Sequence, residues 1–386
     1  MTKKICMLTI GHAIKDDRIF YKECKSLLNA GFEVHILALV EKDGFARDMQ
    51  GNILNSKAED HFELEGIKVH VIRKTESFSN KISQKILSTD FHKAFVKKGI
   101  ELGAEIYHAH EPDSYLLGLK IQERVKDSKL VLDAHESWGK RGVKAAFAKY
   151  FKLDSLKYLI SANSITRGYL LTLNFKIKTE TIYNTSLFSH KNTLTFDEEK
   201  FKILHEGTLK FNRGLKNICA LAKGLKGKNF NFQIDLAGYI PDEESKYLND
   251  YIKINKLENE INILGNIQYE ELSNTIRDYH LGLILSTQEE NNYLAGPANK
   301  FFNYAAANIP ILCNDLPETS RLVRKFNIGK VNPSDDSLTI IENTSFLIEN
   351  RHELKVYSGN LSKHKDHFTW KNEAEKLIDF YKTYLS

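Results

Sequence analysis

The stretch HAHEPD places two histidines, a glutamate and an aspartate between His108 and Asp113, just where an apolar run stops. Imidazole and carboxylate groups in this pattern can bind a metal ion, transfer protons, or form an ordinary polar loop. Pro112 breaks the course of the chain between them. All three interpretations are open from these residues alone.

A metal site is the least favoured interpretation. A strand-end His-x-His pair binds metal when more histidine and aspartate follow at once, because one ion needs several ligands. Pro112 stands where an aspartate would be wanted, and no compact His/Asp group recurs. The cysteines have no CxxC spacing and are expected to be buried, reduced thiols. They are Cys6, Cys24, Cys219 and Cys313.

The stretch LHEGTLKFNRGLKN (204–217) predicts a strand, a loop and a helix beginning near Gly214. A helix N-terminus offers backbone N–H groups and a positive dipole end to phosphate. Arg213 precedes that helix and can fork onto phosphate oxygens. Many loops between strands and helices carry glycine and arginine, so a phosphate site and an ordinary loop stay equal alternatives here.

The stretch GPANKFFNYAAA (296–307) predicts a second helix start. Gly296 and Pro297 end a loop, Asn299 is expected to cap the helix, and Lys300 lies in its first turn. A lysine is unfavourable at the positive end of a helix unless an anion sits there, such as a nucleotide diphosphate. The alternative is a surface lysine that bends into solvent.

Short β-rich runs alternate with helical patterns, and this alternation occurs twice. Such alternation predicts parallel sheets with right-handed crossovers, so we expect an α/β fold with two Rossmann-like domains facing across a cleft. The expected strands are 4–10, 32–39, 67–72, 106–109, 129–134, 201–207, 230–238, 261–265, 280–286 and 309–315. The expected helices are 17–31, 81–102, 114–125, 214–225, 242–255, 269–278, 299–307, 317–325 and 370–385.

The polar segment 181–200 is the expected domain boundary. We predict an N-terminal domain over 1–183, a C-terminal domain over 184–368, and a terminal helix in 369–386 that packs back on the first domain. Ligands of open parallel sheets bind beyond the carboxyl ends of the strands. His108–Asp113 and Gly207–Gly214 both follow predicted strands, so this placement favours function at both.

The 386 residues carry a net charge of +5, which gives no support to a nucleic-acid role. No membrane-spanning run or signal peptide is evident, and we expect a cytoplasmic protein. Basic residues gather in two stretches, and they predict either solvated helix faces or a surface that contacts anionic lipid at the membrane. They are Lys81, Lys85, Lys93, Lys97, Lys98, Lys140, Arg141, Lys144, Lys149 and Lys152.

These motifs, taken in order, resemble the retaining glycosyltransferases of family 4, which have the GT-B fold. The resemblance runs nearly end to end. It includes DDRIFYKECKSLLNAGFEV, YHAHEPDSYLLGL, KLVLDAHESW, EGTLKFNRGL, LAGYIPDEE, INILGNIQYEEL and GPANKFFNYAAANIPILCND. It implies a nucleotide-diphosphate sugar in the C-terminal domain, an acceptor in the N-terminal domain, and no further cofactor.

The resemblance also assigns residues. His110 matches the histidine beside the donor sugar, and Arg213 the second basic residue of the diphosphate pair, whose first position is Thr208. Two glutamates that the family commonly carries are replaced here by Ala295 and Asn303. In the family, the glutamate at the second of these positions often holds the nucleotide ribose. The donor-side set is Gly207, Thr208, Arg213, Gly296, Asn299, Lys300 and Asn303. The acceptor-side set is Gly11, His12, Arg18, Glu111, Asp113 and His135.

We therefore expect a retaining transferase that extends a glycan or lipid-linked saccharide for a surface polysaccharide. A UDP-sugar is the favoured donor, and a GDP-sugar is the alternative. A hexosamine 2-epimerase of the same architecture is one alternative, because Glu111, Asp133 and Glu136 could move a proton. A non-catalytic nucleotide-sugar-binding protein is the other. We expect His108 to be structural and His110 to act on the donor sugar.

Overall fold

The computed structural model describes residues 2–48, 51–55, 59–74, 90–135, 155–189, 196, 199–267, 269–289, 292 and 294–385. The chain folds as two compact units. Unit 1 comprises Met1–Tyr183 and Glu373–Ser386, and unit 2 comprises Asn184–Asn372. Each unit has its own sheet and its own hydrophobic core.

Unit 1 contains an eight-stranded sheet in the order β3-β4-β2-β1-β5-β6-β7-β8, in which only β3 and β4 pair antiparallel. The central strands are buried along almost their whole length, as expected where helices cover both faces of a parallel sheet. The strands are β1 (Lys4–Thr9), β2 (Glu33–Val40), β3 (His61–Leu64), β4 (Ile67–Arg73), β5 (Ile106–His110), β6 (Lys129–Ala134), β7 (Tyr158–Ser161) and β8 (Lys178–Thr181).

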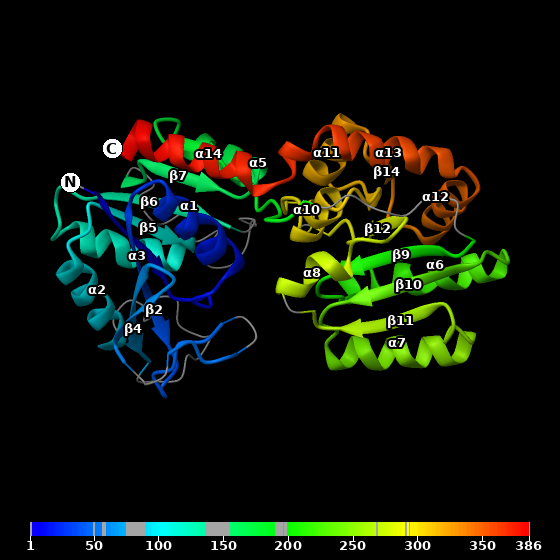
Figure 1. The fold of residues 1–386 in the computed structure, drawn as a ribbon, viewed down its shortest axis with the longest axis horizontal. Helices are drawn as coiled ribbons and strands as arrows, with labels where there is room; N and C mark the ends of the chain where they lie inside the picture. The colour runs from blue at the N-terminus through cyan, green and yellow to red at the C-terminus, as the bar shows by residue number, and fades with distance from the viewer. Residues whose placement is uncertain are drawn as a thin grey trace. The chain divides into compact units, whose positions relative to one another are not determined.

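Helices flank this sheet, as Figure 1 shows for α2 and α3 beside β4 and β5. They are the π-helix η1 (Asp17–Cys24), α1 (Lys25–Asn29), α2 (Asp90–Leu102), α3 (Glu111–Gln122) and α5 (Ser164–Leu173). The Asp16 carboxylate accepts hydrogen bonds from two backbone N–H groups and so caps η1.

The C-terminal segment completes unit 1. Helix α14 (Trp370–Phe380) begins in unit 2, belongs to unit 1 from Glu373 onward, and continues as the π-helix η5 (Tyr381–Leu385). The Tyr381 hydroxyl lies 2.6 Å from His108 Nδ1, and the Tyr183 amide donates to Glu373 Oε2 at 2.8 Å. The segment is thus fixed by buried polar contacts as well as by apolar packing.

Unit 2 contains a six-stranded, fully parallel sheet in the order β11-β10-β9-β12-β13-β14. The strand order reverses between β9 and β12, which are sheet neighbours although they are distant in sequence. The strands are β9 (Phe201–Glu206), β10 (Phe232–Ala237), β11 (Ile261–Gly265), β12 (Leu281–Ile284), β13 (Ile311–Asn314) and β14 (Gly329–Asn332).

The helices of unit 2 cover its sheet, and α7 lies beside β11 in Figure 1. They are the 3-10 turn η3 (Phe211–Arg213), α6 (Leu215–Gly227), α7 (Asp242–Asn255), α8 (Tyr269–Thr275), α10 (Asn299–Ala306), α11 (Pro317–Phe326), α12 (Ser337–Glu349), α13 (Arg351–Lys363) and the 3-10 turn η4 (Lys365–His367). Helix α6 packs between α7 and α12 through its apolar face.

The predicted α/β class with two parallel sheets is confirmed. All four cysteines are buried and free, as expected. The strands β3, β7, β8 and β14, each of four residues, were not predicted from the sequence. It also missed α12 and α13 and expected α3 to begin at Ser114, whereas α3 begins at Glu111.

Candidate functional site

The carboxyl end of β9 lies where the strand order of unit 2 reverses, between β10 and β12. Open parallel sheets bind ligands at such a point. Gly207 follows the last residue of β9 with φ +88°, and its amide donates to the Ala237 carbonyl at 2.7 Å. The chain therefore turns sharply here and exposes backbone at the end of the central strand.

The loop after Gly207 returns to the sheet at Gly214, which has φ +99°. A Cβ at Gly214 would lie 2.5 Å from the Leu285 carbonyl oxygen, so only glycine fits. Gly214 is the N-cap of α6, and no side chain caps that helix. The close approach brings the N-terminus of α6 up to the end of β12, as a phosphate-binding loop requires.

Arg213 immediately precedes this helix. Its side chain is exposed and has no ion-pair partner among the residues that the structure describes. Thr208 is half-buried in the same loop. An unpaired guanidinium next to a helix N-terminus gives the loop two sources of positive potential.

Lys300 lies in the first turn of α10, as predicted, and is only 7% exposed. Its Nζ lies 3.1 Å from Nε2 of His205, which is also buried. Burial lowers the pKa of Lys300 to about 7, with Glu206 opposing the shift and Arg213 adding to it. Burial also lowers the pKa of His205 well below its ordinary value. The lysine therefore does not bend into solvent.

Asn303 lies one turn further along α10. Its Nδ2 donates to both carboxylate oxygens of Glu206, at 3.2 and 3.1 Å. The Glu206 amide donates to the Tyr304 hydroxyl at 2.7 Å, and that hydroxyl donates to the Leu204 carbonyl at 3.3 Å. Helix α10 thus fixes both the side chain and the backbone at the end of β9.

The expected cap of α10 is wrong. The N-cap residue is Ala298, and Asn299 is the first helical residue, where its Oδ1 accepts a hydrogen bond from Asn184 Nδ2 at 2.9 Å. No side chain caps this helix, since its N-cap residue is an alanine. Ala295 and Gly296 lie in the half-buried loop before it.

In unit 1, His110 ends β5 and pairs in register with Asp133 of β6. The Nδ1 atom of His110 lies 3.0 Å from His135 Nε2 and 3.4 Å from Asp133 Oδ2. Its Nε2 has no hydrogen-bond partner among the described residues. Burial lowers the pKa of His110 well below its ordinary value, so the ring is neutral. A neutral ring with one unused nitrogen can bind a hydroxyl group.

His108 and His110 lie side by side in the core of unit 1. Both side chains are buried, and their rings stack with centroids 4.7 Å apart. They differ in their partners, since His108 Nδ1 contacts the hydroxyl of Tyr381. Burial lowers the pKa of His108 as well.

Arg18, predicted on the acceptor side, lies in the core and is 2% exposed. Its Nε and Nη2 donate to the two Asp133 oxygens at 3.0 Å, and Nε lies 2.9 Å from Glu23 Oε1. Burial, reinforced by Asp133, raises the pKa of Glu23 well above its ordinary value. The Arg18 guanidinium therefore lies against both carboxylates.

Four residues of this cluster have metal-ligand spacing, which the sequence did not lead us to expect. One ligand atom from each of Glu23, His108, His110 and Asp133 lies within 4.8 Å of the others. They come from three separated segments, so no compact sequence motif marks them. The Arg18 guanidinium already contacts both carboxylates, which weakens them as ligands for a divalent cation.

The remaining acceptor-side residues surround this cluster. The Glu111 carboxylate accepts the His135 amide at 2.7 Å, and Glu111 itself has φ +69°. His135 also bonds Asp133 at 2.8 Å, while the His12 ring lies 5.0 Å from that of His135. Asp113 is half-buried in the first turn of α3.

A hollow of about 200 Å³ opens at the carboxyl ends of β1 and β2. Gly11 and His12 line it, together with Phe45, Arg47 and Lys74. An aromatic face beside charged groups suits a sugar, whose ring has both apolar C–H and hydroxyl faces. Two predicted acceptor-side residues therefore share one hollow of unit 1.

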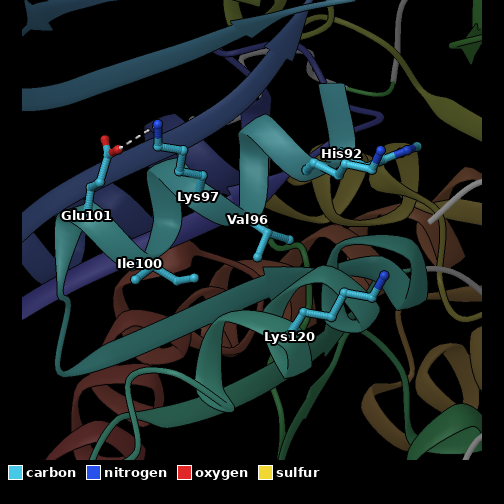
Figure 2. Close-up of a pocket in the computed structure, with 7 residues that line it drawn as sticks. His92, Val96, Lys97, Ile100, Glu101 and Lys120 are labelled. Carbon is cyan, nitrogen blue, oxygen red and sulfur yellow. Dashed lines mark ion pairs between the residues drawn. The ribbon is translucent and has the colours of Figure 1, made fainter. Parts of the chain in front are cut away.

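A second hollow, of about 370 Å³, lies on helices α2 and α3. Figure 2 shows Val96 and Ile100 along α2 and Lys120 on α3, with Lys97 paired to Glu101 at 4.0 Å. Lys93 also lines it. Of the basic residues noted in the sequence, those at 81, 85 and 140–152 lie outside the described residues, as does Glu136.

No protein-family model and no curated relative matches the chain. Solved structures do match over nearly its whole length. A sucrose-phosphate synthase from Thermosynechococcus elongatus has a TM-score of 0.74 at 14% identity, over 98% of both chains. Anabaena HepE in complex with UDP and glucose has a TM-score of 0.73 at 14% identity, over 99% of this chain and 100% of its own.

The lipopolysaccharide outer core galactosyltransferase WaaB has a TM-score of 0.66 at 13% identity, over 98% of this chain and 99% of its own. These likenesses show that the chain has the two-domain, parallel-sheet fold of GT-B glycosyltransferases. In the part of the chain that the structure describes, no helix is both long and apolar enough to span a bilayer.

Proposed function

We propose that this protein is a glycosyltransferase that moves a sugar from a nucleotide-diphosphate sugar to a saccharide acceptor with retention of configuration. A UDP-sugar is the first choice of donor, and a GDP-sugar the second. Anabaena HepE, a fold neighbour, is crystallised with UDP and with UDP-glucose. The acceptor is a glycan or lipid-linked saccharide of a surface polysaccharide.

One observation carries the proposal: two cations, Lys300 and Arg213, and a single carboxylate, Glu206, gather among the described residues at the strand-order reversal of unit 2, so positive charge is in excess there. Lys300 is buried there, and Arg213, at the start of α6, has no ion-pair partner in the described part of the chain. Buried or unpaired cations at a helix N-terminus cost stability unless a ligand supplies the negative charge. A diphosphate supplies it and fits two cations side by side.

These groups also account for the chemistry without a metal ion or other cofactor. The bond between the sugar C1 and the diphosphate oxygen breaks while C1 bonds the acceptor oxygen. The departing phosphate oxygen takes the proton of the acceptor hydroxyl, so no separate base is needed. Arg213, Lys300 and the helix dipole stabilise the negative charge on the leaving diphosphate.

We assign His110 to positioning of the reacting sugar, because its Nε2 is a neutral acceptor atom without a partner among the described residues. Asp133 and His135 hold the ring from its other nitrogen. The hollow around Gly11 and His12 is the proposed acceptor site.

The direct test is Arg213→Ala. Losing a charge-assisted hydrogen bond should weaken nucleoside-diphosphate affinity by about 1.5–3 kcal/mol, measured by calorimetry. Arg213→Lys should recover part of it, because lysine cannot fork onto two oxygens. Lys216→Ala, which removes an exposed charge on the same helix, is the control. Equal UDP affinity in parent and Arg213→Ala would rule out the assignment.

Turnover separates this function from its rivals. A transferase consumes donor sugar only when an acceptor is present, whereas a 2-epimerase converts the donor alone. A nucleotide-sugar-binding protein does neither. Product analysis by NMR also gives the anomeric configuration, and an inverted product would contradict the proposed retention.

We further propose that the protein works in the cytoplasm, in peripheral contact with anionic membrane through α2. Lys93 and Lys97 have side chains 70% and 81% exposed. Each basic residue near such a surface contributes about 1 kcal/mol. Sedimentation with anionic vesicles should fall for the double variant Lys93→Glu, Lys97→Glu, and neutral vesicles are the control. Equal sedimentation of both proteins would refute the contact.

A further inference from the structure

Tyr381, in the C-terminal π-helix η5, contacts the strand that carries His110. Its side chain is fully buried, and its hydroxyl lies 2.6 Å from Nδ1 of His108. Burial raises the pKa of Tyr381 well above its ordinary value, so the hydroxyl keeps its proton. The end of the chain therefore makes a polar contact with a residue two positions before His110.

The other nitrogen of the His108 ring indicates the direction of this hydrogen bond. Nε2 of His108 faces Oδ2 of Asp133 at 3.6 Å. Asp133 is an acceptor, since both of its oxygens receive hydrogen bonds from Arg18. Nε2 therefore carries the ring proton, and Nδ1 accepts the hydrogen bond of the Tyr381 hydroxyl. A partner at one nitrogen thus sets both the tautomer and the orientation of the ring.

Three rings follow one another from Tyr381 to His110. The centroids of Tyr381 and His108 lie 6.1 Å apart with planes at 23°, and those of His108 and His110 lie 4.7 Å apart with planes at 20°. Nδ1 of His110 lies 3.0 Å from His135 Nε2. A ring held at one nitrogen can still pivot about that contact. The flat face of the His108 ring restricts this pivot.

The Nε2 atom of His110, which we assign to the donor sugar, is therefore fixed indirectly. It has no hydrogen-bond partner among the described residues that could hold it. Its direction depends on the contacts of Nδ1 and on the plane of the His108 ring. Groups that act on a substrate must be held to within about 0.5 Å by the residues behind them. A misplacement of about 1 Å can lower a rate by about a hundredfold.

We propose that Tyr381 is a positioning residue of the transfer reaction: its hydroxyl fixes the His108 ring, and that ring fixes the His110 imidazole against the donor sugar. This inference rests on the proposed function, since it concerns the same site. It gives the C-terminal segment a part in turnover as well as in packing. The simpler interpretation is that Tyr381 only anchors η5 to the sheet. The hydroxyl would then affect stability and leave turnover per folded molecule unchanged.

Tyr381→Phe tests the proposal, because it removes the hydroxyl and keeps the ring. Initial rates of UDP release from UDP-glucose by the full chain should show kcat lowered about tenfold. The KM for the donor should stay within about twofold of the parent value, since positioning acts on the transition state. A thermal melt gives the folded fraction to which each rate is referred.

Tyr107→Phe is the matched control. Tyr107 is a buried tyrosine of the same strand, whose hydroxyl donates to the Gly99 carbonyl at 2.6 Å and accepts from the Ala104 amide at 3.0 Å. Neighbouring residues of a strand point to opposite faces of the sheet, so its side chain lies away from His108. This variant loses buried hydrogen bonds as Tyr381→Phe does, and it should keep the kcat of the parent.

A second variant separates positioning from anchoring. His108→Asn removes the ring and keeps an acceptor oxygen at the same distance along the side chain as Nδ1, so the contact with Tyr381 can remain. Anchoring predicts a normal kcat per folded molecule. Positioning predicts a loss at least as large as in Tyr381→Phe, because the face that supports His110 is gone. This variant also decides the question if Tyr381→Phe fails to fold.

Ring-nitrogen NMR after isotope labelling of the histidines tests the link without any turnover. Tyr381→Phe should move the signals of both His108 and His110, and Tyr107→Phe should move neither. Unchanged His110 signals in Tyr381→Phe would overturn the proposal.

The kinetic outcomes are equally definite. Unchanged kcat in Tyr381→Phe, or an equal loss in Tyr107→Phe, would overturn the proposal while the proposed function stands. A parent that binds neither UDP nor GDP would refute the proposed function, and this inference would fall with it whatever the NMR signals show.

Discussion

The two sheets end in opposite electrostatic arrangements. In unit 1, the buried guanidinium of Arg18 lies against two buried carboxylates, Asp133 and Glu23, so its charge is matched within the protein. In unit 2, the Glu206 carboxylate acts on Lys300, and Arg213 has no ion-pair partner among the described residues. The first arrangement satisfies its charges within the protein, and the second leaves positive charge for a ligand.

Because of this difference, we expect charged residues at the strand ends of unit 1 to contribute mainly to stability and those of unit 2 mainly to ligand binding. Both clusters lie at the carboxyl end of a central parallel strand, where ligands bind in this type of fold. A buried charge pair is costly to break, because the partner left behind stays buried and uncompensated. An unmatched cation costs little to remove for folding, yet its loss removes the attraction for an anion. Matched substitutions should therefore have opposite effects in the two units.

The largest effect is expected for Arg18→Met. It leaves the Asp133 carboxylate buried without its cation, and the free energy of unfolding should fall by about 3–5 kcal/mol. Arg213→Met is the matched change in unit 2 and should alter it by no more than about 0.5 kcal/mol. Urea unfolding followed by circular dichroism measures both. Equal stability of the two variants would abolish the distinction between the units.

The next effect concerns the two stacked histidines of unit 1. His110→Ala should lower turnover on the order of a hundredfold while nucleoside-diphosphate binding stays nearly intact, because loss of positioning acts on the transition state. His108→Ala removes the buried contact with the Tyr381 hydroxyl and should cost about 1–3 kcal/mol of stability.

Initial rates per folded molecule and melting curves separate these two histidine effects. If His108→Ala abolishes turnover in a folded protein and His110→Ala leaves turnover unchanged, the two roles are exchanged. Comparable losses of turnover in both would mean that the stacked pair acts as one unit.

A smaller effect is expected from pH at Lys300, whose pKa is lowered to about 7 in the free protein. The diphosphate binds the protonated amine, so binding takes up a proton above this pKa and affinity falls as pH rises. The fall should approach tenfold per pH unit. A UDP-sugar is the suitable probe, because its diphosphate is fully ionised near neutral pH and its charge does not change over this range.

Lys300→Arg keeps its charge across this range. Its affinity profile should therefore be flat between pH 6 and about 8.5, measured by calorimetry at each pH. A parent profile as flat as that of Lys300→Arg would show that Lys300 is already charged in the free protein, or does not contact the ligand.

No effect on transfer is expected from a chelator. In the proposed mechanism the helix dipole, Arg213 and Lys300 neutralise the diphosphate in place of a metal ion, and in unit 1 Arg18 already contacts the carboxylates of the four-residue metal-ligand group. Transfer rates with and without excess EDTA measure this. Loss of activity that magnesium, manganese or zinc restores would show that a metal ion takes part.

Much of the candidate donor site was predictable from local pattern. The glycine turn after β9, the arginine before α6 and the lysine in the first turn of α10 lie within short stretches whose spacing indicates a strand end or a helix start. His205 and Glu206 were missed, although they stand at a strand end just as His108 and His110 do. The same rule applied to both strands would have found them.

The acceptor side was less predictable, because its residues were assigned by resemblance alone. Gly11 and His12 line a hollow, but Arg18 is an ion-paired core residue. An arginine in a helix has no local mark that separates a ligand contact from a buried pair. Only its partner decides, and the partner of Arg18, which lies in η1, is Asp133 on β6.

The sequence by itself determined the parallel sheets, the strand ends and the helix starts, because side-chain periodicity and turn chemistry act over a few neighbouring residues. Only the tertiary structure decided which charges meet. Arg18 and Asp133 are 115 residues apart, His108 and Tyr381 are 273 apart, and Glu206 and Asn303 are 97 apart. Such contacts depend on strand order and helix packing, and they set whether a buried charge is neutralised within the fold or left for a ligand.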